Sequence, residues 1–378
     1  MKGNMRFCVP CLFGVEGLVA QELRDMGLEQ VQAENGRVLF SGGWEAMVRA
    51  NLCGRFGERV LLLLGEFPAR SFEELFQGVK ALPWEGLLGK EDAFPVTGSS
   101  LSSQLHSVPD CQAIIKKAIV ERLKAKYKLS WFAESGALHR VRFRILKDQV
   151  SVMVDTSGEG LHKRGYRALS NDAPMKETLA ASLCQLSRLR QDGHLIDPFC
   201  GSGTILIEGA LLARNIAPGL GRAFTAESWG SVPGQLWQQE RERARSLERR
   251  DTGFTAQGFD VDPAAVELTL ANAQKAGVED CITASVRDVR DFTQEGPYGC
   301  VVCNPPYGER LLDVRQAQEL YRALGQVFQP RRGWSFGVIS PDPEFESLFG
   351  RKADKRRKLY NGMIQCQYYQ YFRGSDKR

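Results

Sequence analysis

The tetrapeptide Asn304-Pro305-Pro306-Tyr307 combines residue types that suit chemistry on an exocyclic amino group. Such a nitrogen on a nucleic-acid base is a poor nucleophile, because its lone pair is delocalised into the ring. The Asn304 side-chain oxygen and the Pro305 carbonyl can accept its hydrogens and direct the lone pair at an electrophilic methyl group. The prolines restrict the loop, and Tyr307 offers a ring for base stacking, worth about 1–3 kcal/mol. We expect catalysis by alignment on a base held outside its stack.

A second stretch, IDPFCGSGTILIEGA (196–210), indicates a strand, a tight turn with Gly201 and Gly203, and a helix. It lacks the lysine of a nucleoside-triphosphate loop. Leu206 occupies the third glycine position of a dinucleotide fingerprint, and no ribose-binding acid lies at the usual distance. S-adenosylmethionine needs no phosphate cradle but does need close backbone approach, which glycines permit.

Acidic residues follow three successive predicted strands, as a nucleoside cofactor without phosphates requires. Asp197 would accept from the cofactor's amino group, Asp260 (with Asp262 as second choice) from the ribose hydroxyls, and Asp288 from the adenine amino group. We therefore predict S-adenosylmethionine as the cofactor. The expected cofactor-binding residues are Asp197, Phe199, Gly201, Gly203, Thr204, Asp260, Val261, Asp288, Val289 and Asn304.

The carboxyl-terminal half of the chain alternates between strands and helices. Apolar strand patterns at 194–199, 255–262, 282–288, 298–303 and 334–340 are separated by helical patterns at 204–215, 263–277 and 314–329, after a first helix at 176–189. This alternation predicts an α/β domain with a mostly parallel sheet. The closing stretch, 363–372, is expected to pair antiparallel at an edge, and the mixed-charge stretch 238–250 to form a solvated helix.

The amino-terminal half reads instead as small α+β units. A helix is predicted at 109–127, with an apolar stripe from Ile114 to Leu123 and lysines mainly off that stripe. A hairpin is predicted at 138–158, followed by a linker rich in Gly, Ser and Pro.

Composition sets further bounds. The length of 378 residues suits two or three domains, and neither a membrane span nor a signal peptide is apparent, so a cytoplasmic protein is expected. The pairs Cys8/Cys11 and Cys300/Cys303 lack two further zinc ligands, which predicts free thiols and no metal. Net charge is only +5, but basic clusters at 116–128, 161–167 and 351–358 favour a polyanionic partner.

The blocks DTSGEGLHKRGYR, APMKETLAASL, DPFCGSGTILIEGA and NPPYGERL resemble those of the THUMP-domain RNA methyltransferases, specifically the RlmL-like group that methylates guanine N2 in 23S ribosomal RNA. The resemblance covers nearly the whole chain. It implies a Rossmann-like class I S-adenosylmethionine-dependent methyltransferase domain preceded by an α+β ferredoxin-like and THUMP region. The expected boundaries are 1–66 for the ferredoxin-like region, 67–157 for THUMP, 158–172 for a linker and 173–378 for the methyltransferase domain. Ala173 and Pro174 would line the methionine end of the cofactor.

The target base stays open at this point, because the same tetrapeptide serves adenine-N6, cytosine-N4 and glutamine-N5 methyltransferases. The THUMP-like half favours RNA, with ribosomal RNA ahead of tRNA, and a monomer or a weak dimer is compatible with the sequence. Adenine-N6 transfer to DNA or RNA, and guanine-N2 transfer to tRNA, are the alternatives. A catalytically silent RNA-binding assembly factor is a third class, disfavoured by the intact acids and tetrapeptide. Expected RNA contacts are Lys116, Lys117, Lys124, Lys163, Arg164 and Arg167.

Overall fold

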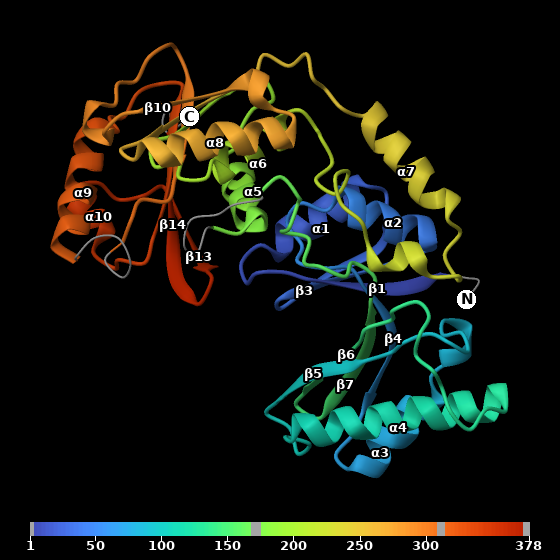
Figure 1. Cartoon of the computed structure of the whole chain (residues 1–378). Coiled ribbons are helices and arrows are strands. Elements are labelled where there is room, and N and C mark those ends of the chain that lie inside the picture. Colours follow the sequence, from blue (N-terminus) through green and yellow to red (C-terminus); the bar gives the residue numbers. More distant parts are fainter. Residues whose placement is uncertain (1–3, 168–174, 308–313, 373–378) are drawn as a thin grey trace. The chain divides into compact units, whose positions relative to one another are not determined.

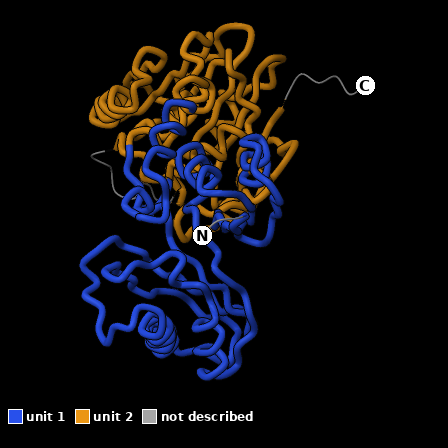
Figure 2. Tube along the Cα trace, turned by 90° about the vertical axis from the view of Figure 1, so that its right-hand side faces the viewer, with its two compact units in different colours: residues 1–11, 19–161, 222–243 blue, residues 12–18, 162–221, 244–378 orange. Residues whose placement is uncertain are grey.

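The computed structural model describes residues 4–167, 175–307 and 314–372 (Figure 1). These fall into two compact units, each built around its own sheet. Unit 1 holds residues 1–11, 19–161 and 222–243, and unit 2 holds 12–18, 162–221 and 244–378 (Figure 2). Two short segments therefore belong to the unit other than the one that surrounds them in the sequence: 12–18 to unit 2 and 222–243 to unit 1. No change in composition along the sequence indicates this.

Unit 1 is built on one seven-stranded sheet with the order β2-β3-β1-β4-β7-β6-β5. Only β5 and β6 pair in parallel within it. Since β4 pairs with both β1 and β7, the two predicted α+β regions of this half share a continuous sheet. The strands are β1 (Met5–Pro10), β2 (Glu29–Glu34), β3 (Arg37–Gly42), β4 (Leu61–Pro68), β5 (Val96–Leu101), β6 (Val141–Leu146) and β7 (Gln149–Asp155), and the helices are α1 (Glu16–Asp25), α2 (Trp44–Cys53), α3 (Phe72–Ala81) and α4 (Val108–Tyr127).

The helix predicted at 109–127 is α4, and its apolar stripe is buried. Ile115, Ala118, Ile119 and Leu123 are buried, whereas Ile114 is only half-buried. The prediction is confirmed because apolar residues at three- and four-residue spacing share one helix face. The hairpin predicted at 138–158 is likewise confirmed as β6 and β7.

Unit 2 has a seven-stranded sheet with the order β10-β9-β8-β11-β12-β14-β13. Strands β8 to β12 are parallel, and the strand order reverses at β8, as in doubly wound α/β domains. The predicted α/β fold class is therefore confirmed. The strands are β8 (His194–Asp197), β9 (Thr255–Asp260), β10 (Ile282–Val286), β11 (Gly299–Cys303), β12 (Trp334–Ser340), β13 (Lys355–Asn361) and β14 (Ile364–Phe372), and the helices are α5 (Glu177–Leu186), α6 (Thr204–Ala213), α8 (Pro263–Ala276), α9 (Val314–Val327) and α10 (Phe345–Phe349).

The edge strand of this sheet is not the one that the sequence predicted. β14 does pair antiparallel with β12, but β13 pairs with its other side and takes the edge. β13 carries the basic run Lys355–Lys358, whose charges hide the period-two pattern by which strands are recognised. The prediction that 363–372 forms the edge was therefore wrong.

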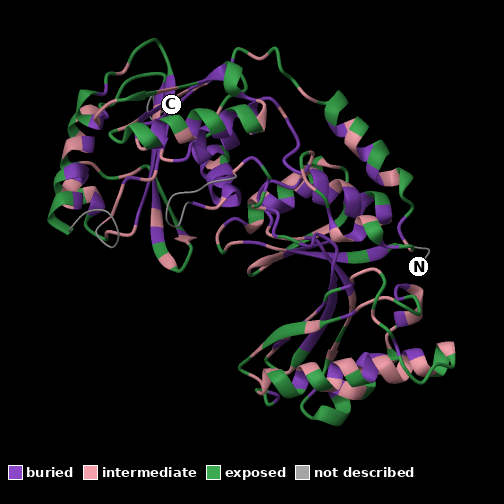
Figure 3. Cartoon of the chain, in the orientation of Figure 1, coloured by how far each residue is buried: buried purple, intermediate pink, exposed green. Residues whose placement is uncertain are grey.

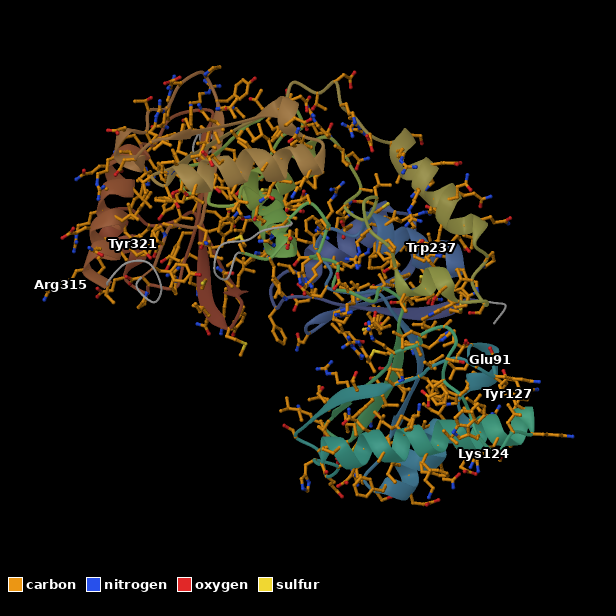
Figure 4. The ribbon with its side chains drawn as sticks, in the orientation of Figure 1. Glu91, Lys124, Tyr127, Trp237, Arg315 and Tyr321 are labelled. Carbon is orange, nitrogen blue, oxygen red and sulfur yellow. The ribbon has the colours of Figure 1, made fainter. Side chains whose placement is uncertain are left out.

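The long segment between α6 and β9, called the insertion below, contains residues 222–243, which belong to unit 1. Its mixed-charge stretch forms the predicted helix, α7 (Gln235–Ser246). Figure 3 shows both buried and exposed residues along α7. Trp237, labelled in Figure 4, is buried and stacks on Phe224, and Glu240 pairs with Arg49 at 2.8 Å. The predicted helix is therefore solvated on most of its surface, but the face that carries Trp237 and Glu240 is buried, which the prediction did not foresee.

Within the described ranges, no helix is long and apolar enough to cross a membrane. All ten cysteines are free thiols, nine of them buried, as predicted. Among the residues with assigned structure, no cluster of three or more His, Cys, Asp or Glu side chains could hold a metal ion.

Candidate active site

The predicted site residues of unit 2 gather at one edge of its sheet. Asp197 ends β8, Asp260 ends β9, and Asn304 follows β11 directly. β8 lies between β9 and β11, and all three run in the same direction. The carboxyl edge of a parallel sheet, next to the point where strand order reverses, is where open α/β domains bind ligands.

The turn between β8 and α6 depends on its two glycines. Gly201 has φ +53° and Gly203 has φ +77°, values that other residues rarely adopt. From α8, the Thr269 hydroxyl donates to the Gly201 carbonyl and the Asn272 amide donates to the Ser202 carbonyl, both at 2.9 Å. Sequence reasoning missed both donors, because their burial against the glycine turn appears only in the fold.

The two glycines serve different purposes. A Cβ added at Gly203 would lie 2.9 Å from the Thr269 side chain, so this glycine permits close packing against α8. Among the described residues, a Cβ at Gly201 would meet only the Phe199 carbonyl oxygen, at 4.0 Å. Gly201 is therefore the position at which a ligand can approach the backbone. Thr204, which begins α6, is buried below the turn.

The carboxyl group of Asp197 has a strongly raised pKa. Its side chain is buried, and one oxygen accepts from the backbone N–H of Phe199 at 3.1 Å. Burial raises the pKa of Asp197 to about 8; the Phe199 hydrogen bond opposes this effect and the Asp260 charge adds to it. A buried carboxyl of this kind favours a cationic ligand group, which compensates the cost of ionisation.

Asp260 connects the first two strand ends. Its carboxylate accepts from the Gly201 N–H at 3.0 Å and from the Asp262 N–H at 3.1 Å. Each oxygen keeps a further lone pair with which it can accept from a ribose hydroxyl. Asp262, the second choice, instead caps α8 by accepting from Ala264, and the side chain of Val261 is exposed beside it.

Asp288 and Val289 follow β10 and begin a short 3₁₀ turn. The Asp288 carboxylate accepts from the N–H of Arg290 and forms an ion pair with its guanidinium, each at 2.8 Å. Val289 is buried in the hydrophobic core. Asp288 therefore already has a cationic partner that a ligand amino group would have to share.

Asn304 and Tyr307 belong to the loop that follows β11. Asn304 Oδ1 is buried and, within the described part of the chain, has no hydrogen-bond partner. Pro305 is buried, Pro306 half-buried, and the Tyr307 hydroxyl accepts from Asn361 Nδ2 at 2.7 Å. Asn361 was missed by sequence reasoning, because only the fold brings it to a loop 54 residues earlier.

Two thiols lie near this edge. Burial raises the pKa of Cys200 to about 12 and that of Cys303 well above its usual range, and the Asp197 charge adds to both shifts. Both groups are therefore neutral thiols near pH 7. Because the thiolate is the reactive form, neither is suited to act as a nucleophile.

The basic residues predicted for α4 are partly engaged within unit 1. Lys116 lies 3.5 Å from the Phe94 ring centroid and pairs with Glu134 at 2.5 Å. Lys124 pairs with Glu121 at 3.2 Å, and Figure 4 labels it near the carboxyl end of the helix. Lys117 is exposed. The three lysines lie on one helix as predicted, and their contact with RNA stays a prediction.

The predicted RNA-binding cations of the linker differ in exposure: one is exposed and two pair with carboxylates of unit 2. Lys163 is exposed, whereas Arg164 is buried and pairs with Glu208, which also accepts from the Tyr166 hydroxyl. Arg167 pairs with Glu177 at 2.6 Å. The assignment of Arg164 to RNA is therefore corrected: its guanidinium neutralises a buried carboxylate of α6 and is shielded from phosphate.

The donor set of the site fits S-adenosylmethionine. Gly201 leaves room for backbone approach, Asp197 suits an ammonium group, and Asp260 has lone pairs for ribose hydroxyls. Ala173 and Pro174, expected at the methionine end, lie outside the described residues.

A family model described as "RMKL-like, methyltransferase domain" matches residues 164–370. The chain belongs to the RMKL-like methyltransferase family. Two further models match the amino-terminal half of this RMKL-like chain: an RlmL ferredoxin-like domain over residues 6–61 and a THUMP domain over residues 69–155. The resemblance seen in the sequence blocks is thereby confirmed.

Relatives of this RMKL-like methyltransferase extend over nearly its whole length. It is 44% identical to the "Putative RNA methyltransferase YpsC" of Bacillus subtilis (strain 168), over 95% of this chain and 94% of that one. It is 35% identical to the ribosomal RNA large subunit methyltransferase K/L of Psychromonas ingrahamii, over 99% of this chain but 51% of that protein. The crystal structure of SMU.472, described as a putative methyltransferase complexed with SAH, matches with a TM-score of 0.94, at 42% identity and full coverage of both chains.

Proposed function

We propose that this protein is an S-adenosylmethionine-dependent RNA methyltransferase that acts on the exocyclic N2 of a guanine in 23S ribosomal RNA. The observation that carries the proposal is the buried Asn304 Oδ1, which lacks a protein partner among the described residues at the ligand-binding edge of the sheet. An unsatisfied buried acceptor is costly, so its retention beside Tyr307 indicates a donor supplied by the substrate.

The geometry around Asn304 suits a planar amino group. Asn304 Oδ1 and the carbonyl of the buried Pro305 are two acceptors in consecutive residues, which matches the two hydrogens of an NH₂ group. Accepting both hydrogens orients the nitrogen lone pair away from the ring plane. Tyr307, held through its hydroxyl by Asn361, offers its ring as a stacking surface for the base.

The acids at the ends of β8 and β9 would bind the cofactor. When bound, S-adenosylmethionine supplies a methyl group on a positively charged sulfur. Asp197 would accept from the amino group of its methionine end and Asp260 from the ribose. Gly201 lacks a side chain where the ligand would lie against the backbone, and Gly203 lets the turn pack closely against α8. The chain's contribution to the rate is then orientation, with no covalent intermediate.

The choice of RNA rests on the amino-terminal half. A THUMP model matches residues 69–155, and relatives that cover nearly all of this chain are named as RNA methyltransferases. The choice of ribosomal guanine rests on the K/L relative and on the RlmL-like domain at 6–61. This chain spans about half the length of that relative, so the target nucleotide is part of the proposal.

The experiment is methyl transfer from labelled S-adenosylmethionine to undermodified ribosomal RNA, tRNA and duplex DNA, followed by nucleoside analysis. We expect label in N2-methylguanosine from ribosomal RNA. Label in N6-methyladenine would overturn the base assignment, and label confined to tRNA or DNA would overturn the substrate. Binding of the cofactor with no transfer to any substrate would favour a silent RNA-binding factor.

A further inference from the structure

The β13–β14 hairpin of unit 2 reaches the edge of the sheet that carries Asn304. β14 is antiparallel to β12, and β13 is antiparallel to β14, so β13 ends at the same edge as the parallel strands. The two-residue turn Gly362-Met363, which joins the strands labelled β13 and β14 in Figure 1, therefore lies at the ligand-binding edge by the directions of these strands. The 2.7 Å hydrogen bond from Asn361 to the Tyr307 hydroxyl fixes the hairpin to the catalytic loop.

The strand that leads to this turn is strongly basic. The four consecutive residues Lys355 to Lys358 are all exposed. Arg356 pairs with Glu346 at 3.3 Å and Arg357 donates to the Gly14 carbonyl. Among the described residues, Lys355 and Lys358 form no ion pair; Lys358 lies only near the Tyr360 ring, 5.7 Å from its centroid. Lys358, three residues before Asn361, is thus available for phosphate near the catalytic loop, and Lys355 is a second available cation at the start of the same strand, on its other face.

Protection of an edge strand against aggregation explains some charge on β13, but it does not explain the turn. Met363 is 97% exposed, and it lies next to Gly362, whose φ of +63° is suited to a tight two-residue turn. A fully exposed apolar side chain works against edge protection. Apolar side chains on nucleic-acid-binding elements can insert beside unstacked bases, and base-modifying enzymes must withdraw their target from its stack.

We propose that the β13–β14 hairpin binds the RNA segment that adjoins the target nucleotide. Lys355 and Lys358 contact its phosphates, and Met363 packs against the bases from which the target is withdrawn. This inference rests on the proposed function and adds an RNA-binding surface within unit 2, separate from the THUMP region.

The first test is the double variant Lys355→Gln/Lys358→Gln in the full chain. The matched control is Lys275→Gln/Arg332→Gln, which removes two exposed charges at the end of α8 and ahead of β12, at the opposite edge of the sheet. Fluorescence anisotropy with a single-stranded RNA fragment of the methylated region is measured between 50 and 200 mM salt. We expect roughly tenfold weaker binding, and a slope of log affinity against log salt lower by about 1.4, since each phosphate contact on a single strand contributes about 0.7.

The outcomes separate the two proposals, because RNA binding is measured without methyl transfer. An unchanged affinity and salt slope in the hairpin variant, or an equal change in the control, would overturn the hairpin surface even if the enzyme is active. A wild-type protein that binds RNA through this hairpin but transfers no methyl group would contradict the proposed function alone.

The second test is Met363→Ala, with Met363→Leu as the conservative variant. On an RNA whose target base is paired, we expect kcat/KM to fall about tenfold in the alanine variant and to recover with leucine. On an RNA with the same target unpaired, the alanine variant should lose less than twofold. Equal effects on both substrates, or no recovery with leucine, would contradict the role of Met363 in unstacking. Affinity for S-adenosylhomocysteine should be unchanged in every variant.

Discussion

Asn304 carries the chemistry at the scale of a single residue, so its removal should separate catalysis from cofactor binding. Asn304→Ala deletes the buried acceptor Oδ1, which has no partner within the structure's described ranges. Loss of one preorganised polar group from a transition state costs about 10²–10³-fold in kcat. We expect at least this loss in methyl transfer, while calorimetry shows nearly unchanged affinity for S-adenosylmethionine. A large loss of cofactor affinity would contradict the role assigned to Asn304.

Asp197 gives the site a dependence on pH. Burial raises its pKa in the folded protein to about 8, above the usual value of 3.8, so the empty folded protein holds a proton that the unfolded chain releases. Stability of the empty protein therefore falls as pH rises between these two values. The cofactor's ammonium group needs the ionised carboxylate, so S-adenosylhomocysteine should bind more weakly below about pH 8, by up to about tenfold per pH unit.

This prediction is tested by calorimetry in buffers of different ionisation enthalpy. Wild-type protein should release protons when it binds S-adenosylhomocysteine at pH 7, whereas Asp197→Asn should bind more weakly and release fewer. Asp197→Asn should also be more thermally stable than wild type at pH 9 when empty, and this advantage should shrink steadily as the pH is lowered towards 4. A proton release that is the same in both proteins would show that Asp197 is not the coupled group.

At the scale of elements, the glycine turn allows a matched pair of substitutions. Gly203→Ala places a Cβ 2.9 Å from Thr269 on a backbone with φ +77°, so strain and overpacking together should lower the unfolding free energy by about 2–4 kcal/mol. The Cβ of Gly201→Ala meets no described atom closer than 4.0 Å, so only about 1–2 kcal/mol of backbone strain is expected. Its main effect should be weaker cofactor binding. Chemical denaturation and calorimetry on both variants check this, and equal losses of affinity and stability would refute the division of roles.

The sequence predicted most elements of unit 2 because each strand and helix has a local pattern. The carboxyl ends of the parallel strands then follow from the alternation, which is why Asp197, Asp260 and Asn304 were found together. The edge strand β13 was missed because its side chains are charged on both faces. Arg164 was misassigned because its partner Glu208 lies 44 residues later on α6, and no local pattern reveals a buried ion pair.

At the scale of the whole molecule, α4 is expected to contribute RNA affinity from unit 1. Neutralising Lys116, Lys117 and Lys124 together should weaken RNA binding and flatten its salt dependence. Because Lys116 and Lys124 already pair with Glu134 and Glu121, we expect the slope to change by less than three full phosphate contacts. Affinity for S-adenosylhomocysteine should stay the same. An unchanged salt slope would show that these lysines of α4 are not part of the RNA-binding surface.

The order of the chain does not coincide with its division into units. Residues 222–243 fall inside the methyltransferase family match yet belong to unit 1, where Trp229 stacks on His139 at 4.4 Å and donates to the Leu138 carbonyl at 2.9 Å. Trp229 is buried, so this insertion supplies part of the core of unit 1. A cut between the units near residue 162 would therefore leave unit 1 without one of its own segments.

Trp229→Ala tests this dependence in the full chain. Loss of a buried tryptophan should lower the unfolding free energy by about 3–5 kcal/mol, and hydrogen exchange should accelerate around residues 138–141 of unit 1. Trp229→Phe keeps a ring for stacking and should lose only part of this stability. Because β8 and β11 belong to the other sheet, exchange there should change little. Equal acceleration in both sheets would mean that the insertion stabilises the molecule as one cooperative body rather than unit 1 alone.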